Sequence, residues 1–286
     1  MTHATYSLTL PASRASCAVF SSPHSGRDYT DAFRKLSVLD AAALRSSEDA
    51  FVDDLFTAAP DLGAPLLAAR VPRAFIDLNR AADELDPALI DEVIRAPHNP
   101  RVSSGLGVVP RVVANGRAIY HGKLPLHEAF GRIDGHWKPY HATLRRLLDE
   151  SLAAFGEAVL IDCHSMPREA IEAHARVGSA RPDVVLGDRF GASAGAGVVD
   201  QIEAAFRGAG LIVARNAPFA GAYITQTYGR PARNCHAVQI EIDRSLYMIE
   251  DRIARRPDFA AFQKLMTGVV AGIIGSVAGS LPLAAE

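Results

Sequence analysis

Two histidines that follow apolar runs are the residues of this chain best suited to chemistry. His164 comes shortly after the apolar run 158–161, and His24 follows the run 18–20 through a short Ser-Ser-Pro segment. Ligands of open α/β sheets bind where strands end, and imidazole is a preferred zinc ligand. A catalytic zinc takes three protein ligands and keeps an open position for water. The pattern therefore predicts a zinc site to which two distant segments each contribute a histidine.

An arginine follows another short apolar segment. Arg80 comes at the end of Asp-Leu-Asn-Arg, after a strand predicted over 74–78. Its guanidinium offers a fixed fork of donors for a carboxylate or for the oxyanion that develops when a carbonyl is attacked. The alternative is a surface arginine paired with Asp83 or Glu84, since exposed ion pairs of this kind are common.

A carboxylate lies on the polar face of a late predicted strand. Polar and apolar residues alternate over 236–243, which places Gln239 and Glu241 on the face opposite Val238 and Ile240. A strand carboxylate that reaches into a pocket can act as general base toward metal-activated water, and then as general acid toward a leaving nitrogen. A solvated outer face is the alternative interpretation.

The elements that must position these residues alternate between strands and helices, which predicts an α/β fold. We expect a single domain over residues 1–286, with a mixed, mostly parallel, twisted sheet flanked by helices, because no linker or internal repeat divides the chain. Strands are predicted near 17–21, 65–70, 74–78, 107–113, 117–120, 158–163, 183–187, 211–214 and 236–242.

Helices and turns are predicted from periodicity and from turn residues. Residues 41–59 have the pattern of an amphipathic helix. The pair Asn115-Gly116 between two apolar runs is a hairpin signal, because both turn positions need positive φ. Residues 126–155 are predicted to be helical, with a break at Gly135 and Pro139.

The overall composition excludes several classes of function. The chain has 286 residues, 49% of them hydrophobic, and a formal charge of −2. Its lysines and arginines are scattered, which argues against nucleic-acid binding. Three widely spaced cysteines suit reduced thiols, and no signal peptide is recognisable, so a cytoplasmic protein is expected. The apolar tail 265–284 contains glycines and a proline, which favours a packed terminal helix over a membrane span.

Five short motifs, in order and spanning nearly the whole chain, resemble those of the N-formylglutamate amidohydrolase family. That family is similar in fold to the zinc carboxypeptidases and aspartoacylases. Any one motif is a weak signal, whereas five in sequence are a strong one. The motifs are Ser22-Pro23-His24-Ser25-Gly26, Asp77-Leu78-Asn79-Arg80, Gly122-Lys123-Leu124-Pro125-Leu126, Asp162-Cys163-His164-Ser165-Met166-Pro167 and Gln239-Ile240-Glu241.

The resemblance implies a role for each matching residue. His24 and His164 become metal ligands, and Glu241 becomes the general base. Arg80 becomes the group that polarises the scissile carbonyl, and Asn79 becomes a substrate contact. The roles of the two histidines, Arg80 and Glu241 agree with those expected from the residues alone.

The third metal ligand departs from the carboxypeptidase pattern. Carboxypeptidases have a zinc-binding glutamate three positions after the first histidine, where this chain has Arg27. The resemblance to the amidohydrolases makes Asp49 the third ligand instead. Glu48 and Asp28 are the nearby alternatives for this ligand. The acid at 48 or 49 could also be an ordinary solvent-facing residue of a helix.

Several further residues are candidates for substrate contacts. The resemblance implies this role for Tyr223, Thr225 and His141, although each could equally be a packing residue. His236 is interpreted as an orienting partner of the metal site or as a core histidine. Arginines that could bind substrate carboxylates are Arg101, Arg111, Arg132, Arg215 and Arg244. The histidines expected to be structural or at the surface are His3, His98, His121, His127, His136 and His174.

The predicted activity is zinc-dependent hydrolysis of an N-formyl or N-acyl amino acid, with one metal ion per chain. The resemblance implies N-formyl-L-glutamate as substrate, formate and L-glutamate as products, and a place in histidine degradation. A small molecule is the expected partner, with no nucleic acid and no membrane. The alternatives are a carboxypeptidase or deacylase of different substrate range and a non-catalytic metabolite-binding protein. A serine hydrolase is disfavoured because no Gly-x-Ser-x-Gly motif is present.

Overall fold

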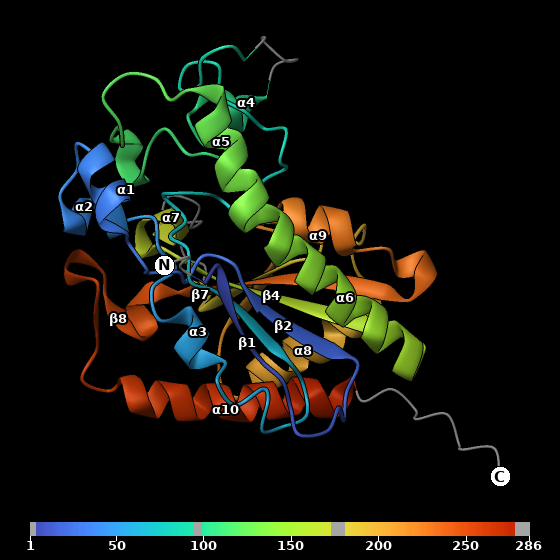
Figure 1. The fold of residues 1–286 in the computed structure, drawn as a ribbon. Coiled ribbons are helices and arrows are strands. Elements are labelled where there is room, and N and C mark those ends of the chain that lie inside the picture. The colour runs from blue at the N-terminus through green and yellow to red at the C-terminus, as the bar shows by residue number, and fades with distance from the viewer. Residues whose placement is uncertain (1–3, 94–98, 173–180, 278–286) are drawn as a thin grey trace. The chain divides into compact units, whose positions relative to one another are not determined.

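The structure is a computed structural model that describes residues 4–93, 99–172 and 181–277 (Figure 1). The chain divides into two compact units, each assembled from separate segments. The first contains the described parts of Met1–Ser7, Pro23–Ala50 and Ala68–Thr143, and the second those of Leu8–Ser22, Phe51–Leu67 and Leu144–Glu286. His3, His98 and His174 lie outside the described residues.

A seven-stranded sheet has the order β1-β3-β2-β4-β7-β5-β6. β2, β4 and β7 run parallel, β5 is antiparallel to β7, and β6 is parallel to β5. The expected α/β class, with a mixed and mostly parallel sheet flanked by helices, is therefore confirmed (Figure 1). The strands are β1 Tyr6–Thr9, β2 Ala18–Ser22, β3 Leu66–Ala69, β4 Ala158–Met166, β5 Val184–Gly187, β6 Val213–Arg215 and β7 Cys235–Asp243.

The central strands β4 and β7 are longer than their apolar runs. Every residue of β4, including its polar residues, is buried, and so is β7 after its first residue. Strands of a parallel sheet covered on both faces are expected to be apolar throughout. Both strands instead continue through polar residues, which are Asp162, His164, Gln239 and Glu241. As a result β4 extends to Met166, whereas the sequence predicts its end near 163. The polar side chains of β4 and β7 therefore project from the rigid backbone of the central strands.

Helices of the second unit pack against one another and the sheet. α10 (Phe259–Ser276) packs against α8 (Ala196–Gly208) and α3 (Val52–Leu55), as expected for a terminal helix. By length and composition α10 is the one helix in the described residues that could cross a membrane, with 33% of its apolar window buried. α9 (Tyr223–Tyr228) packs against β4 and β7, and α7 (Arg168–Glu172) follows β4.

The first unit consists mainly of short helices and loops. Thr30 and Asp40 cap α1 and α2 by accepting hydrogen bonds from backbone N–H groups, which explains where these helices begin. Its aromatic core includes Phe33 packed edge-on against Phe75, with the Arg132 guanidinium 4.0 Å from the Phe75 ring. The helices are α1 Asp31–Leu36, α2 Ala41–Arg45, α4 Pro100–Ser103, α5 Leu126–Arg132 and the first turns of α6 Lys138–Phe155.

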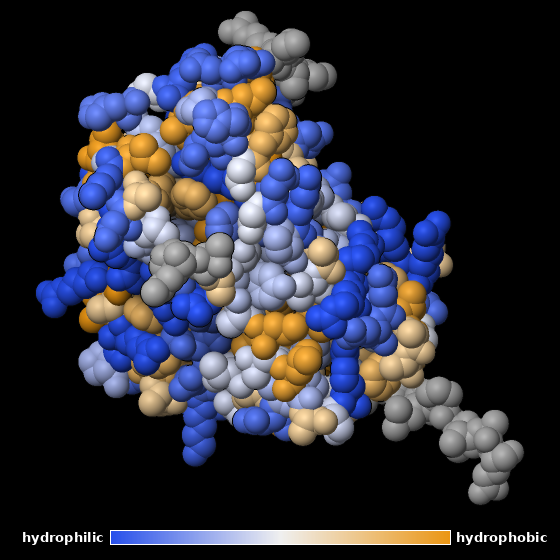
Figure 2. All heavy atoms as spheres, in the orientation of Figure 1, coloured by the Kyte–Doolittle hydropathy of each residue, from blue (hydrophilic) through white to orange (hydrophobic). Residues whose placement is uncertain are grey.

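The surface shown in Figure 2 is mostly hydrophilic, with apolar residues in small patches. Large apolar side chains that are exposed are few among the described residues, because most of the hydrophobic residues are in the core. They are Leu10, Leu36, Val38, Leu106, Phe130, Phe190 and Ile212.

Two predicted elements are replaced by turns. Residues 41–59 do not form one helix, because Phe51 adopts a left-handed conformation with φ 65° between α2 and α3. Residues 74–78 do not form a strand, since Phe75 and Ile76 donate their backbone N–H groups to the carbonyl of Pro72. Arg80 therefore follows a hydrogen-bonded turn and not a strand end. The strand β1 was not predicted.

Two other predictions hold in altered form. The strands predicted at 107–113 and 117–120 do not form, and their hairpin is reduced to a single bridge between Val112 and Ala118. Residues 114–116 form a 3-10 turn in which Gly116 has φ 70°. The predicted break near Gly135 is a π-helical turn, Ile133–Trp137, between α5 and α6. A π turn widens the helix without ending it, just before the residue Pro139 that lacks a backbone donor.

Candidate active site

His24 lies two residues after β2 and is buried. The chain turns there at Gly26, where a Cβ atom would stand 2.0 Å from the carbonyl oxygen of Val71. No side chain fits at that distance, so glycine lets the backbone following His24 pack directly on the neighbouring segment. Gly26 is thus a packing requirement that fixes the course of the chain directly after His24.

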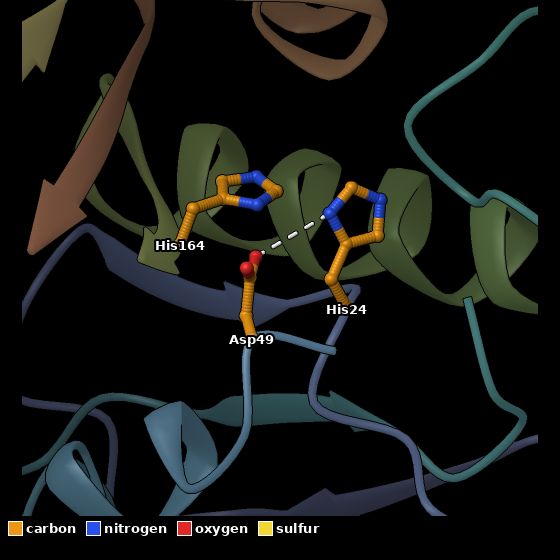
Figure 3. Close-up of side chains that lie close together, drawn as sticks. All are labelled: His24, Asp49 and His164. Carbon is orange, nitrogen blue, oxygen red and sulfur yellow. Dashed lines mark ion pairs between the residues drawn. The ribbon is translucent and has the colours of Figure 1, made fainter. Parts of the chain in front are cut away.

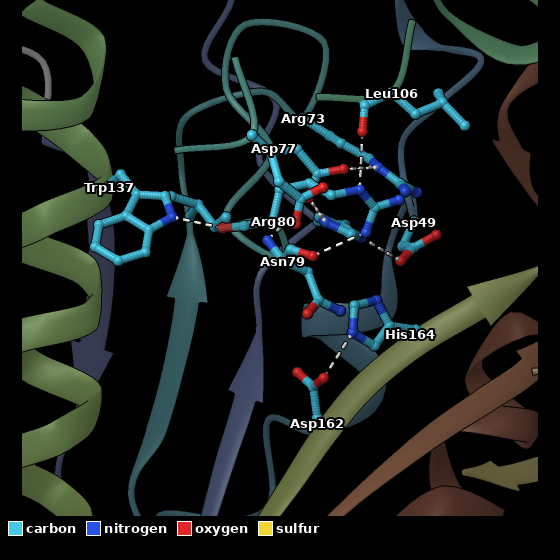
Figure 4. A network of polar contacts seen from close by, with 12 residues as sticks. Asp49, Arg73, Asp77, Asn79, Arg80, Leu106, Trp137, Asp162 and His164 are labelled. Atoms are coloured by element: carbon cyan, nitrogen blue, oxygen red, sulfur yellow. Dashed lines mark hydrogen bonds and ion pairs between the residues drawn. The ribbon is translucent and has the colours of Figure 1, made fainter. Parts of the chain in front are cut away.

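Asp77 holds the ring of His24. Nε2 of His24 donates to Oδ1 of Asp77 over 2.7 Å, and Asp77 also accepts from the backbone N–H of Asn79 and from Nε of Arg73 (Figure 4). Burial raises the pKa of Asp77, but His24, Arg73 and Arg80 outweigh burial and hold this pKa well below its usual value. The ionised Asp77 therefore favours the tautomer of His24 with its proton on Nε2, so that Nδ1, which faces Asp49, is the atom that could bind a metal ion.

This pairing predicts that Asp77→Asn weakens metal binding. The variant keeps the volume of the side chain but removes the negative charge that orients and polarises the imidazole. Metal affinity, measured by competition with a chromophoric chelator, should fall by about 10- to 100-fold. Asp61→Asn, at an exposed position, is the matched control. Equal affinities for Asp77→Asn and the unmodified protein would show that Asp77 does not act on the ligand.

Asp49 is the acid next to His24. It lies in the loop between α2 and α3, not within a helix as predicted, and its backbone N–H donates to the carbonyl of His24 over 3.0 Å. Its Oδ2 stands 3.4 Å from Nδ1 of His24. The two alternatives are engaged elsewhere, Glu48 with Arg45 at 3.0 Å and Asp28 with Arg70 at 2.8 Å.

His164 lies near the carboxyl end of β4 and is buried. Asp162, two residues earlier on the same face of the strand, is at ion-pair distance, with 3.1 Å between Oδ2 and Nε2 of His164 (Figure 4). Asp162 has no solvent exposure. Like His24, this histidine therefore has a carboxylate beside Nε2, an arrangement that is common around metal ligands.

His24, Asp49 and His164 form a buried group that could hold a metal ion (Figure 3). Each offers one ligand atom, and these atoms all lie within 4.8 Å of one another. It is the one such group of histidine, cysteine and acidic residues found within residues 4–93, 99–172 and 181–277. Two imidazoles and one carboxylate are the ligand types of catalytic zinc sites.

Arg80 and Asn79 are buried in the first unit. Arg80 donates from Nε to the carbonyl of Leu106 and from a terminal nitrogen to the carbonyl of Asn79 (Figure 4). Burial lowers the pKa of Arg80 below its usual value. Both of these hydrogen bonds go to backbone oxygens, and the side chain is buried, so the alternative of a surface ion pair with Asp83 or Glu84 does not describe Arg80. Trp137 donates to the carbonyl of Arg80.

Glu241 is buried on β7, so a solvated outer face is wrong for this strand. It is the ladder partner of His164, while Gln239 is the partner of Asp162. Residues paired in a ladder project from the same face, so these four polar side chains share one face of the sheet. Nε2 of Gln239 donates to Oε1 of Glu241 over 2.7 Å.

The other candidates have structural partners. Nε2 of His141 donates to the carbonyl of Leu78, and the hydroxyl of the fully buried Thr225 donates to the carbonyl of Ala222. Tyr223 is partly exposed at the start of α9. His236 accepts from the backbone of Gly195 and pairs with Glu157, at the end of β7 remote from Glu241, so it does not orient the metal site.

Four of the five arginines proposed for substrate carboxylates are likewise held by protein groups. Arg111 pairs with Asp86, Arg132 with Glu128, and Arg215 with Asp200 and Glu203. Arg244 donates to the hydroxyl of Ser165, and Arg101 is exposed on α4. None of these contacts identifies a carboxylate-binding arginine.

Sequence reasoning assigned no role to Asp77, Asp162 or Gln239. Each lies inside a motif and two residues from a residue with a proposed role. In strands β4 and β7, the spacing of two puts the two side chains on the same face. That spacing was the available signal for Asp162 and Gln239, whereas the Asp77–His24 pair joins segments 53 residues apart.

A mixed α/β sheet that presents imidazoles and carboxylates near its strand ends, with a group able to hold a metal, suits metal-assisted hydrolysis. The family model described as N-formylglutamate amidohydrolase matches residues 16–248. The chain belongs to the N-formylglutamate amidohydrolase family and is an amidohydrolase enzyme.

Two named relatives and a solved structure agree with this assignment. The chain is 35% identical to an N-formylglutamate deformylase of Pseudomonas putida, covering 81% of this chain and 82% of the relative. It is 34% identical to one from Pseudomonas aeruginosa, covering 85% and 86%. The crystal structure of N-formylglutamate amidohydrolase from Ralstonia eutropha superposes with a TM-score of 0.89 at 36% identity, over 96% of this chain and 99% of that one.

A gene product of Agrobacterium tumefaciens shares the fold, with a TM-score of 0.62 at 18% identity over 95% of this chain and 97% of that one. Membership of an enzyme family favours catalysis over the alternative of a non-catalytic binding protein.

Proposed function

We propose that this enzyme hydrolyses N-formyl-L-glutamate to formate and L-glutamate, using one zinc ion per chain. The observation that carries the proposal is the buried group of His24, Asp49 and His164 in a chain whose relatives are N-formylglutamate deformylases. In the reaction, water adds its oxygen to the formyl carbon and the amide C–N bond breaks. The nitrogen leaves as the amine of glutamate.

The residues present fit a zinc ion. The donor set is two nitrogens and one oxygen, and two of the ligands are neighbours of buried carboxylates that can orient them. A zinc ion held by His24, Asp49 and His164 would lower the pKa of water and act as a Lewis acid toward a carbonyl oxygen. Three protein ligands leave a coordination position for water or substrate.

Glu241 and Arg80 supply the other chemical functions. Glu241 accepts a proton from the attacking water and later donates a proton to the leaving nitrogen, so one carboxyl group serves both steps. Arg80 stabilises the negative charge that develops on the carbonyl oxygen, since a buried guanidinium is worth more there than one in water. Asn79, Tyr223, Thr225 and His141 are the proposed substrate contacts.

The wider setting follows from the same proposal. Residues 1–286 act as one catalytic domain on a small N-acyl amino acid, in the cytoplasm, as a step of histidine degradation. Neither a nucleic acid nor a membrane takes part.

A substrate panel with metal removal tests the proposal. Purified enzyme should hydrolyse N-formyl-L-glutamate much faster than N-acetyl-L-glutamate or a C-terminal glutamyl peptide, as measured by release of primary amine. Full chelation should abolish turnover, and zinc should restore it. Turnover that persists in metal-free protein would contradict the metal mechanism. Faster cleavage of the acetyl or peptide substrate would contradict the proposed substrate and favour a deacylase or carboxypeptidase.

A further inference from the structure

One face of the central sheet carries an unusual row of polar side chains. Asp162 and His164 on β4 stand beside Gln239 and Glu241 on β7, as two consecutive pairs on the same face of the ladder. All four are buried, with exposed fractions between 0% for Asp162 and 7% for Glu241. Buried polar groups are costly unless they have partners, so the contacts within this row determine what each group can do.

Within the row, Gln239 is hydrogen-bonded to the proposed general base. Its Nε2 donates to Oε1 of Glu241 over 2.7 Å, between residues two apart on one strand. A glutamate side chain has several rotatable bonds, and a proton acceptor works only within hydrogen-bond reach of the proton it takes. A donor fixed on a rigid strand restricts Glu241 to one orientation.

The surroundings of Gln239 hold its amide in place. On one side its ladder partner is Asp162, and on the other it is Gly187 of β5. A Cβ atom at Gly187 would lie 2.7 Å from the backbone of Ala220 and Gly221, so this turn packs where a side chain would otherwise stand. Gln239 therefore lies between a fully buried carboxylate and tightly packed backbone, with little room for another rotamer.

The chemical type of residue 239 fits an orienting role. A lysine or arginine at 239 would pair with Glu241 and weaken it as a base, and an acid would repel it. A neutral amide supplies one N–H donor and no charge. Gln239 also has a buried Oε1 with no hydrogen-bond partner in the described part of the chain. Such a group costs stability, and local costs of this kind are expected at functional sites.

We propose that Gln239 is a positioning residue for catalysis, which acts through Glu241 by holding its carboxylate in the orientation needed for proton transfer. The inference rests on the proposed function of Glu241 as general base. Gln239 itself touches neither substrate nor metal in this mechanism.

Steady-state kinetics of Gln239→Met test the proposal. Methionine has nearly the same length but no N–H donor, so kcat should fall by about 10- to 100-fold, the effect expected of a small misplacement of a reacting group. KM and zinc affinity should remain close to those of the unmodified enzyme. Gln201→Met, at an exposed position of α8, is the matched control and should leave all three quantities unchanged.

A double-mutant cycle separates positioning from an independent role. In a Glu241→Gln background, Gln239→Met should cause no further loss of kcat, because the group it orients is already absent. A full further loss in that background would overturn the proposal, and so would an unchanged kcat in the folded, zinc-loaded single variant. If Gln239→Met does not fold, Gln239→Leu serves in its place, since it also lacks the N–H donor and adds no charge beside Glu241.

The same experiments distinguish failure of this inference from failure of the proposed function. The assay uses whichever substrate of the panel the unmodified enzyme hydrolyses. Absence of any turnover by the unmodified, zinc-loaded enzyme would contradict the proposed function. Normal turnover by the unmodified enzyme and by Gln239→Met alike would contradict only the role of Gln239.

Discussion

Glu241→Gln is expected to lower kcat by about 100- to 10,000-fold, the range that general acid–base catalysis contributes in enzymes. The amide has the size and shape of the carboxylate but cannot accept the proton. Glu241 projects from β7, a buried strand, so its replacement should leave the sheet intact. The measurement is kcat with N-formyl-L-glutamate at saturating substrate and saturating zinc.

Zinc content decides how this loss is interpreted. Glu241→Gln should bind one zinc per chain with unchanged affinity, because Glu241 does not belong to the group of His24, Asp49 and His164. Glu169→Gln, on the exposed side of α7, is the matched control and should keep full activity. If Glu241→Gln retained near-normal kcat, another residue would have to be the general base.

Asp49→Asn is expected to weaken zinc binding by more than about 100-fold, since loss of a direct ligand should exceed the 10- to 100-fold effect of an outer partner. The matching variant at the neighbouring acid, Glu48→Gln, should bind zinc normally. Glu48 is engaged with Arg45, whereas Asp49 belongs to the group with the two histidines. Zinc affinity by chelator competition, with turnover measured at increasing zinc, tests both variants.

One result of this comparison would contradict the assignment of Asp49 as a zinc ligand. The two variants are well matched, because both change a buried acid in the same loop. If Glu48→Gln lost zinc and Asp49→Asn kept it, the assignment of Asp49 as the third ligand would be wrong. Circular dichroism should show that both variants fold, so that a difference in zinc affinity reports on the ligand and not on stability. Recovery of turnover in Asp49→Asn at high zinc would show that the rest of the site is intact.

The chain's local patterns predicted the sheet well. Apolar runs located β2, β3, β4, β5, β6 and β7, because a buried parallel strand must be apolar along most of its length. The same patterns failed at 107–113 and 117–120, where no strand forms, and at 74–78, where a turn follows Pro72. Short apolar runs do not distinguish a strand from a buried loop, since both are buried for the same reason.

Local patterns also indicate several residues of the candidate site. His24, His164 and Glu241 were found from their positions in or after strands, and the structure shows all three buried. Asp49 is implied by the family resemblance alone, and the sequence pattern predicts a helix where the structure has a loop. The left-handed residue Phe51 that interrupts the helix is not a residue type that favours this conformation, so no sequence signal marked it.

By itself, then, the order of residues determined the α/β class, the buried strands and the kinds of groups available for chemistry. Those properties depend on periodicity and residue type over a few neighbours. Only the tertiary structure decided which partner each group has, such as Asp77 for His24 and Arg45 for Glu48. Hydrogen bonds and ligand sets require atoms a few ångströms apart, and segments far apart in the chain reach that separation only when the whole fold packs.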